Sequence, residues 1–515
     1  MRNTRRKSTV FTLTLGIALC AFAGVDALLP WPQKVEPDEG FFVAKEDAAS
    51  VHIKETADAS LPKEGYRLTV APDGITVKSA DAAGAFYARQ TLRQLAEKEK
   101  DGWRYPCVKI EDWPAYAWRG VLLDEGRHFF GKETVLQLLD LMSRYKLNVF
   151  NWHLTEDQGW RLDVPAYPKL AQCGSMRLRS PAHGSWLKCN RKEFIYESSK
   201  MTTEKYGPFF YTADDVKEVL AYAKARHIQV VPEIELPGHA RGALGAYPEF
   251  ACFPERIPAG SAADDWGIFR DVFCIGNDRT VKFLEDVMDY VCELFPDSPV
   301  IHIGGDECPR VNWEECPKCQ ARMKAEGLEK AGDLQAWITR RIAARMAKKG
   351  RRIIGWDEIL SGDVPKSAIG LSWRMAKGEG AGTEHVSGAD GAVKGYDMVM
   401  TPHRLCYYNY LQGVAEDPFK RGGPPLTLEK AYSFDPLEGV PEAARVHILG
   451  GQCCLWGEYI WNMYDLAWRM WPRAFAMSEV LWTAPKARDF GAFERRAAVE
   501  RSRLIKMGVN CAPLK

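Results

Sequence analysis

The sequence predicts an α/β protein in which a small α/β domain, with the character of an α+β sandwich, precedes a (β/α)8 TIM barrel. A length of 515 residues exceeds one small domain. Strand and helix patterns alternate through most of the chain, and polar residues directly follow the predicted strands. The composition, 46% hydrophobic and 27% charged, is globular and opposes a disordered or multi-span membrane protein.

The charge balance limits the partners. There are 69 Lys and Arg against 68 Asp and Glu, a formal net charge of +1. Because basic and acidic residues are nearly equal in number, the chain lacks the excess of positive charge that binds a polyanion. We therefore expect no nucleic-acid partner.

Residues 1–23 have the pattern of a secretory signal peptide. Basic residues precede an apolar run over 10–25, and Ala21-Phe22-Ala23 supplies a small-x-small cleavage site. We therefore expect export to the periplasm or beyond, without a stable membrane span, because the run is short for one. A lipoprotein anchored through Cys20 is disfavoured by the bulky Leu19, and Arg5-Arg6 is a weak twin-arginine signal.

Residues 28–114 are expected to form a non-catalytic α/β domain. Two alternating strands, 66–70 and 75–77, flank a Pro-Asp-Gly turn that ends at Gly74. A helix follows over 82–95. No catalytic constellation occurs in this region.

Residues 115–515 are expected to form the barrel. Helices are predicted where apolar residues recur at i, i+3, i+4 and i+7, as at Val135, Leu138, Leu139 and Met142. Short apolar segments between the helices predict the strands, which fall at 120–124, 147–154, 228–234, 300–304, 352–356, 369–373, 398–401 and 448–455.

The chain has 14 cysteines, and cleavage after Ala23 would leave an odd number. Cys316-Pro-Lys-Cys319, with Cys308 upstream, is compatible with a zinc half-site or a disulfide. Because no second CxxC pair supplies the remaining ligands, a local disulfide or unpaired loop cysteines are favoured over a metal. Cys453 and Cys454 lie in an apolar strand and are predicted to be buried packing residues.

Polar and aromatic residues cluster at the carboxyl ends of the predicted strands. In a barrel these ends form one face, where such enzymes build their active sites. The residues concerned are Asp124, Arg127, His128, His153, Glu156, Asp157, Glu233, His239, Asp306, Glu307, Trp356, Asp357, Trp373, Arg374, Tyr407, Asn409, Trp456 and Glu458.

Asp306 and Glu307 are the candidate reactive pair. Gly304-Gly305 precedes them and allows a substrate to approach closely. Two adjacent carboxylates raise the pKa of one of them, so that one acid stays protonated while the other remains an anion. Tryptophans at neighbouring strand ends suit the C–H faces of sugars or small apolar groups.

Several motifs resemble those of family 20 glycoside hydrolases, the β-N-acetylhexosaminidases, in order and at the expected spacing. The resemblance extends from Trp118 to about Trp482, and the small leading domain also resembles that family's N-terminal domain. The motifs are Arg119-Gly-Val-Leu-Leu-Asp124, Trp152-His-Leu-Thr-Glu-Asp-Gln-Gly-Trp-Arg161, Pro232-Glu-Ile-Glu-Leu-Pro-Gly-His239, His302-Ile-Gly-Gly-Asp-Glu307, Gly355-Trp-Asp-Glu358 and Leu455-Trp-Gly-Glu458.

The resemblance implies an exo-acting, retaining enzyme that removes terminal β-linked N-acetylglucosamine or N-acetylgalactosamine from oligosaccharides or glycoconjugates, without cofactor or metal. In this scheme the 2-acetamido group of the substrate is the nucleophile. Glu307 would be the acid and base, Asp306 would accept the acetamide N–H, and Tyr407 would donate to its oxygen. Trp356, Trp373 and Trp456 would enclose its methyl group, Arg119 and Glu458 would bind the terminal sugar hydroxyls, and Asp157 with His239 would support Glu307.

Two positions depart from the family pattern. Glu156 stands where an aspartate commonly precedes Asp157. Asn409 stands where the family often has an aspartate near the sugar O4 and O6, and the lost charge should weaken one hydrogen bond by roughly 1 kcal/mol. It also removes repulsion of an anionic 6-substituent, so we hypothesise tolerance of 6-sulfated N-acetylglucosamine.

Two other functions compete. A metal-dependent barrel hydrolase would use His153, His239, His302, Asp306 and Glu307 as ligands, but the tryptophans then have no role. A non-catalytic carbohydrate-binding relative should have lost an acid, whereas both Asp306 and Glu307 are present.

Overall fold

The computed structural model describes residues 24–183, 185, 187–374, 385–415, 417–419 and 423–515. The predicted signal peptide, residues 1–23, lies outside this part of the chain. No helix within the described ranges is long and apolar enough to cross a membrane. The chain divides into two units, one running through Trp113 and including Gly491–Arg503, the other comprising Pro114–Phe490 and Leu504–Lys515.

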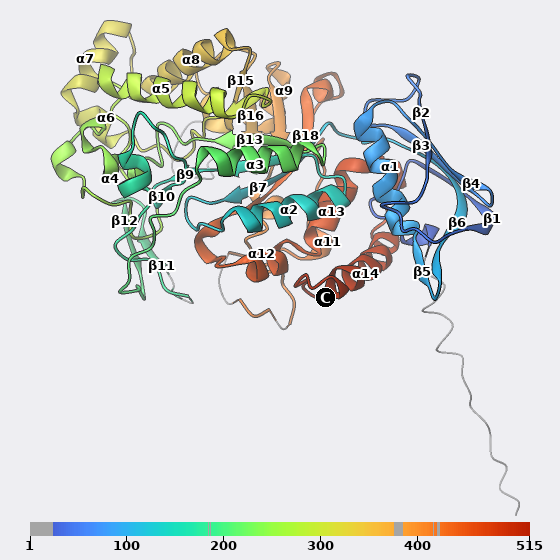
Figure 1. The fold of residues 1–515 in the computed structure, drawn as a ribbon. Coiled ribbons are helices and arrows are strands. Elements are labelled where there is room, and N and C mark those ends of the chain that lie inside the picture. Colours follow the sequence, from blue (N-terminus) through green and yellow to red (C-terminus); the bar gives the residue numbers. More distant parts are fainter. Residues whose placement is uncertain (1–23, 184, 186, 375–384, 416, 420–422) are drawn as a thin grey trace, which may run out of the picture. The chain divides into compact units, whose positions relative to one another are not determined.

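The first unit is a six-stranded sheet in the order β1-β6-β3-β4-β2, with β5 paired to β6 and α1 packed on β3 and β4 (Figure 1). The predicted hairpin and helix are present. The strands missed by the sequence analysis include β1, whose residues are all exposed or half-buried and so lack a buried apolar alternation. The elements are β1 (Lys34–Ala44), β2 (Lys54–Ala57), β3 (Tyr66–Ala71), β4 (Gly74–Ser79), α1 (Ala82–Leu95), β5 (Glu97–Glu99) and β6 (Gly102–Asp112).

The last helix, α14 (Phe490–Lys506), contributes most of its length to the first unit. Arg503 Nη2 donates to the carbonyl of Gln94 at 2.9 Å, and the Arg496 guanidinium lies 5.1 Å from the Trp31 ring centre. The prediction that residues 115–515 belong wholly to the barrel therefore needs correction for 491–503. The apolar face of a helix indicates that the helix packs on a hydrophobic core, but it does not indicate which domain that core belongs to.

The second unit is a closed parallel barrel in the order β13-β14-β15-β16-β17-β18-β7-β8, which confirms the predicted fold class. Each barrel strand coincides with a predicted one to within a few residues. They are β7 (Trp118–Asp124), β8 (Val149–His153), β13 (Gln229–Glu233), β14 (Val300–His302), β15 (Arg352–Trp356), β16 (Ile369–Ser372), β17 (Asp397–Met400) and β18 (Ile448–Leu455).

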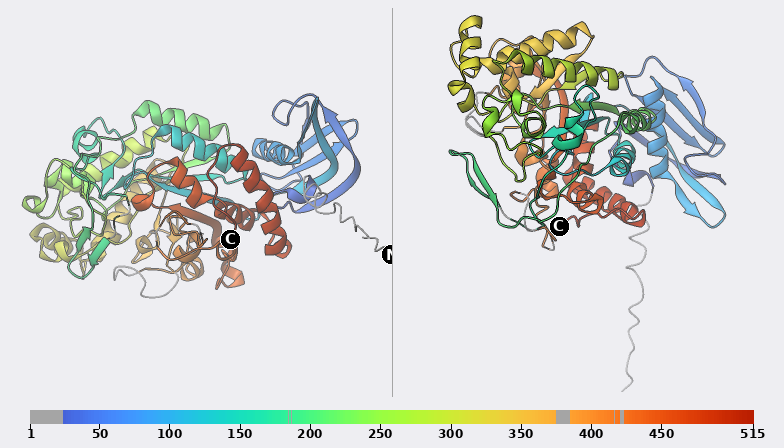
Figure 2. Two further views of the ribbon diagram at one scale, coloured as in Figure 1. Left: turned by 90° about the horizontal axis from the view of Figure 1, so that it is seen from below. Right: turned by 60° about the vertical axis from the view of Figure 1, so that its left-hand side comes forward.

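Helices surround these strands, as Figure 2 shows from two further directions. They are α2 (Lys132–Arg144), α3 (Ala213–Lys224), α4 (Arg241–Ala246), α5 (Asp278–Leu294), α6 (Val311–Glu315), α7 (Pro317–Glu326), α8 (Asp333–Lys348), α9 (Gly388–Val393), α10 (His403–Cys406), α11 (Leu428–Tyr432), α12 (Met463–Met470) and α13 (Arg473–Trp482). The short strands β9 (Thr155–Glu156), β10 (Gly159–Trp160), β11 (Leu187–Asn190) and β12 (Ile195–Ser198) lie in the loops after β8.

The barrel interior is a packed apolar core that extends up to the aromatic residues at the strand ends. Leu122, Val231, Ile354 and Val399, from four different strands, are members of one buried cluster that also includes Trp356 and Trp456. Cys453 and Cys454 are fully buried, as predicted. The strand register then fixes which polar residues meet above this core.

Candidate active site

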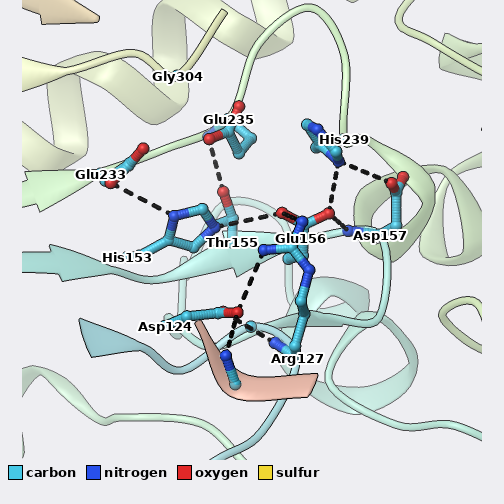
Figure 3. A network of polar contacts seen from close by, with 12 residues as sticks. Asp124, Arg127, His153, Thr155, Glu156, Asp157, Glu233, Glu235, His239 and Gly304 are labelled. Atoms are coloured by element: carbon cyan, nitrogen blue, oxygen red, sulfur yellow. Dashed lines mark hydrogen bonds and ion pairs between the residues drawn. The ribbon is translucent and has the colours of Figure 1, made fainter. Parts of the chain in front are cut away.

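The carboxyl ends of β7, β8 and β13 bring acidic and basic side chains into one buried network (Figure 3). Asp124 pairs in register with His153, which in turn pairs with Glu233. The ring of His153 lies between two carboxylates, with Nδ1 3.3 Å from Glu233 Oε2 and Nε2 3.3 Å from Glu156 Oε2. Strand register alone therefore aligns residues that are far apart in the sequence.

Asp306 and Glu307 leave β14 through a turn that only glycine permits. Gly304 and Gly305 have φ values of 61° and 101°, in the left-handed region. A Cβ at Gly304 would lie 1.8 Å from Glu235 Oε2, so a larger residue would have to displace that buried carboxylate. Glu307 also has a positive φ of 45°, which is uncommon for a residue with a side chain.

The two acids remain accessible within this otherwise buried face. The Asp306 and Glu307 side chains are 15% and 20% exposed, whereas those of Glu156 and Asp157 are 1% exposed. Asp306 Oδ1 is buried and has no hydrogen-bond partner among the described residues. It is therefore available to accept a hydrogen bond from a bound molecule.

His239 connects the acid pair to the interior. Its Nδ1 lies 3.0 Å from Asp157 Oδ2 and 2.7 Å from Glu156 Oε1, and its Nε2 lies 3.4 Å from Asp306 Oδ2 and 3.8 Å from Glu307 Oε2. Burial opposes a charge on this ring, but the carboxylates of Glu156 and Asp306 raise the pKa of His239 well above its usual value. The structure thus brings Asp157 and His239 together beside Glu307, where the sequence analysis expected them.

The surroundings of Glu307 favour its protonated form. Its pKa is raised to about 7 as the net result of burial, which raises it most, the positive charge of His239, which lowers it, and the negative charge of Asp306, which raises it. A carboxylic acid with this pKa holds a proton near neutral pH and can donate it to a substrate.

An aromatic wall stands on the same face, formed by Trp356, Trp373, Trp456 and Tyr407. The ring centres of Trp356 and Trp456 are 5.6 Å apart. Tyr407 lies 5.8 Å from Trp456 and 6.5 Å from Trp373, nearly parallel to the latter at 16°. The three predicted tryptophans and the predicted tyrosine therefore belong to one cluster.

Hydrogen bonds fix the orientation of two of these rings. Trp356 Nε1 donates to Glu233 Oε1 at 3.0 Å, and Trp373 Nε1 donates to Glu358 Oε2 at 3.2 Å. Burial raises the pKa of Tyr407 well above its usual value, so its phenol remains neutral and can donate a hydrogen bond.

Arg127 is the site residue that the sequence analysis did not assign. Its guanidinium contacts Asp124 Oδ2 at 3.2 Å, Glu156 Oε2 at 3.1 Å and Glu458 Oε1 at 3.6 Å. It also lies 5.0 Å from the Trp456 ring centre. Its position just after the end of β7 was the available signal, because barrel residues reach the site from strand ends.

The role predicted for Arg119 is wrong. Arg119 is the second residue of β7 and is fully buried at the opposite end of the strand from Asp124. Its Nε and Nη1 donate to the carbonyls of Lys146 and Tyr116, both at 2.8 Å. It therefore stabilises the start of the strand and cannot bind a sugar at the carboxyl end.

Glu458 and Asn409 lie at the edge of the site, after β18 and α10. Glu458 is one-quarter exposed and faces Arg127. Asn409 is 7% exposed, and its side-chain Oδ1 is buried without a hydrogen-bond partner among the described residues. Both side chains thus retain acceptor oxygens for further hydrogen bonds.

The five residues considered as metal ligands do not share a centre. His239, Asp306 and Glu307 form one group, but His153 groups with Glu233 and Glu235 instead. His302 Nδ1 lies 3.2 Å from Glu233 Oε1, on the interior side of the network. The five residues therefore do not form the single set of ligands around one metal ion that a metal-dependent hydrolase requires.

Breaking a glycosidic bond requires a proton donor near neutral pH and an anion that can stabilise positive charge at the sugar. A parallel barrel that presents both, against an aromatic wall at its carboxyl face, has the architecture of a barrel glycoside hydrolase.

Sequence comparison specifies the family. Residues 116–485 match the model of the glycosyl hydrolase family 20 catalytic domain, and residues 43–113 match that of family 20 domain 2. The chain therefore belongs to glycosyl hydrolase family 20.

Similar proteins are β-hexosaminidases and related enzymes. A β-hexosaminidase of Porphyromonas gingivalis is 37% identical over 88% of this chain and 55% of its own length, so this chain spans about half of that relative. A β-hexosaminidase of Akkermansia muciniphila is 31% identical over 93% of this chain and 90% of its own length. The crystal structure of a family 20 exo-β-N-acetylglucosaminidase from Vibrio harveyi, in complex with N-acetylglucosamine, superimposes with a TM-score of 0.82 at 28% identity, covering 100% of this chain and 81% of that one.

Proposed function

We propose that this protein is an exo-acting, retaining β-N-acetylhexosaminidase that hydrolyses terminal β-linked N-acetylglucosamine or N-acetylgalactosamine. The observation that carries the proposal is the acid pair beside the aromatic wall. Glu307 has a pKa of about 7, and the adjacent Asp306 has a carboxylate oxygen without a partner among the described residues. Family membership and the β-hexosaminidase relatives support the same activity.

In the first step the 2-acetamido carbonyl oxygen attacks the anomeric carbon of its own sugar. Glu307 gives its proton to the glycosidic oxygen as the bond from that oxygen to the anomeric carbon breaks. Asp306 accepts the acetamide N–H and stabilises the positive charge of the resulting oxazolinium ion. Tyr407 donates to the acetamide oxygen and holds it in position for attack.

In the second step water attacks the anomeric carbon from the face that the aglycone has left. Glu307, now a carboxylate, takes the proton from this water, and the oxazolinium ring opens to restore the acetamide. Two successive inversions retain the β configuration. The indole faces of Trp356, Trp373 and Trp456 surround the acetamide methyl group and exclude water from it.

Arg127 and Glu458 are proposed to bind the hydroxyls of the terminal sugar, with Arg127 in the role first expected of Arg119. The two side chains form an ion pair at the edge of the site. A charged pair of this kind provides both donors and acceptors to sugar hydroxyls. Recognition of a chain end in this way makes the enzyme exo-acting.

The decisive experiment compares substrates and leaving groups. Glu307→Gln should lose most turnover of natural glycosides but retain more on aryl glycosides with acidic leaving groups, which need no protonation. Wild-type enzyme should cleave 2-acetamido glycosides much faster than the matching 2-hydroxy glucosides. Equal rates on the two would overturn the substrate-assisted mechanism.

We also propose that the protein is exported, because residues 1–23 have the pattern of a secretory signal peptide. N-terminal sequencing of protein recovered from the periplasm or the medium should begin at Gly24. Recovery only from the cytoplasm with Met1 retained would contradict this proposal.

A further inference from the structure

Four cysteines outside the proposed active site converge on one point. Cys252 and Cys274 lie in the segment between α4 and α5, and Cys316 and Cys319 lie where α6 passes into α7. Their four Sγ atoms all lie within 4.8 Å of one another. The sequence analysis considered Cys316 and Cys319 together with Cys308, but Cys308 is not a member of this group.

The main chain positions all four residues. An antiparallel bridge between Ala251 and Phe273 joins the two segments that carry Cys252 and Cys274, and Cys274 N donates to the carbonyl of Phe250 at 2.8 Å. Cys316 is the N-cap residue of α7 and Cys319 follows it by three residues, a spacing that places two side chains on the same face of a helix.

Two further contacts hold the loops together at the CxxC turn. The backbone N–H of Cys319 donates to the sulfur of Cys316. A Cβ at Gly276 would lie 2.2 Å from the Lys318 carbonyl carbon, which shows how closely the loop after Cys274 approaches the turn. Only a glycine allows this approach without a shift of the backbone.

The distances match a tetrahedral metal site and exclude the disulfide. Sγ of Cys274 lies 3.7 Å from both Cys316 and Cys319, and Cys252 Sγ lies 3.8 Å from Cys319. Four thiolates at about 2.3 Å from a central zinc ion have sulfur atoms roughly 3.8 Å apart. A disulfide requires about 2.05 Å, and Cys274 is equally far from two candidate partners.

The surroundings suit a soft divalent cation. Cys274, Cys316 and Cys319 are buried, and Cys252 is partly buried. Four sulfur ligands in tetrahedral positions select zinc or iron, and zinc is the usual ion of isolated four-cysteine sites in proteins.

We infer that Cys252, Cys274, Cys316 and Cys319 bind one structural zinc ion. Four thiolates complete its coordination and leave no open position for a substrate, so the site is not catalytic. The ion would connect the loop after β13, which carries His239, to the segment after β14, which carries Asp306 and Glu307. Neighbouring contacts between the same segments have the same effect, including Trp313 Nε1 to the Phe273 carbonyl at 2.9 Å.

Metal analysis of the full-length protein, purified without a metal-affinity tag, tests the inference. We expect one zinc per chain by inductively coupled plasma mass spectrometry. X-ray absorption at the zinc edge should show four sulfur neighbours at about 2.3 Å. Titration with an organomercurial should release one zinc for each four thiols modified, detected with a chromogenic chelator.

Variants localise the site. Cys274→Ser and Cys319→Ser should each reduce the zinc content at least about tenfold, because three thiolates bind much more weakly than four. Cys292→Ser is the matched control, since Cys292 is buried in α5 but lies outside the group, and its zinc content should be unchanged.

Three results would overturn the inference. They are wild-type protein with no zinc, peptide mapping that finds a disulfide among the four cysteines, and stoichiometric iron in place of zinc. The measurements on wild-type protein stand even if a variant fails to fold. They are also independent of glycosidase activity, so failure of the proposed function would leave this inference intact.

Discussion

At the scale of single residues, Glu307 is subject to opposing influences. Burial and the charge of Asp306 raise its pKa, whereas the protonated His239 lowers it, with a net value of about 7. The proton donor is the acid form, which is present below this pKa and is lost as the pH rises through it. A residue with this balance should control the alkaline limb of the pH profile.

We therefore predict that kcat/KM for a glycoside with a poor leaving group falls as the pH rises above about 7. His239→Gln removes the neighbouring positive charge and should move this limb to higher pH, because the pKa of Glu307 then rises. Steady-state rates measured from about pH 4 to about pH 10 test both statements, because this range extends from the usual pKa of a carboxylate to well above that of an imidazole. An unchanged limb in the variant would show that His239 does not act on Glu307.

Asn409 provides a second test at the residue scale. Its buried Oδ1 has no partner among the described residues, and an aspartate here would add a negative charge at the edge of the site. We predict that wild-type enzyme hydrolyses 6-sulfated N-acetylglucosaminides and that Asn409→Asp loses this activity about tenfold more than activity on the neutral sugar, a difference of ~1.4 kcal/mol. Equally low activity of the wild type and Asn409→Asp on the sulfated substrate would contradict the hypothesis that Asn409 allows a 6-sulfate.

Much of the site was predictable at this scale, because strand-end position is visible in the sequence. The carboxylate pair, the aromatic wall and the Asp157–His239 pair all lie where the motifs indicated. The prediction that Arg119 binds the sugar was wrong because a motif gives the order of residues along the chain and does not show which end of a strand each residue occupies. Counting from Asp124, which ends β7, would have favoured Arg127.

At the scale of elements, β7 carries two arginines with different roles. Arg119 satisfies main-chain carbonyls at the start of the strand, whereas Arg127 contacts three carboxylates just beyond its end. Substitution of each by lysine retains the charge and removes the planar fork of donors. The two substitutions should therefore separate stability from activity.

Arg119→Lys should lower the free energy of unfolding by about 2 kcal/mol, because buried carbonyls lose their partners. Its kcat/KM per folded molecule should remain close to wild type. Arg127→Lys should instead reduce kcat/KM by about 100-fold, or ~2.7 kcal/mol, with a smaller change in stability. Denaturant unfolding gives the stability of both variants, and steady-state kinetics gives their kcat/KM. A larger loss of kcat/KM in Arg119→Lys than in Arg127→Lys would show that Arg119, and not Arg127, binds the substrate.

The barrel strands were predictable because short apolar segments between amphipathic helices have few alternative structures. The sheet of the first unit was harder. The β1 strand exposes most of its side chains, and its pairing with β6 depends on main-chain hydrogen bonds that side-chain patterns do not reveal.

At the scale of the whole molecule, the two units are not two consecutive pieces of chain. Residues 491–503 of α14 return to the first unit, although the sequence predicted a single boundary near residue 114. Contacts between distant segments of this kind depend on packing and not on local propensity. The four-cysteine group was missed for the same reason, because Cys252 and Cys274 join the CxxC pair only in three dimensions.

The returning segment should contribute to the stability of the first unit. Phe493 is fully buried within it, so Phe493→Ala should destabilise the protein by about 3–4 kcal/mol through lost apolar contacts and a cavity. We expect a lower melting temperature by calorimetry and an unchanged kcat on a chromogenic glycoside. Exposed Arg495, substituted by alanine, is the control and should change stability by less than about 0.5 kcal/mol.

The enclosure of Glu233 has a consequence for engineering of this enzyme. Its carboxylate receives hydrogen bonds from Asn151 and Trp356 and lies beside His153 and His302, all of them buried. Changing any one of these residues leaves the others with an uncompensated charge or an unpaired donor. We therefore expect this group to tolerate only simultaneous substitution of interacting residues. Asn409 and Glu458 have no such dependence on Glu233, and directed evolution of new sugar specificities should accumulate its successful substitutions at this edge.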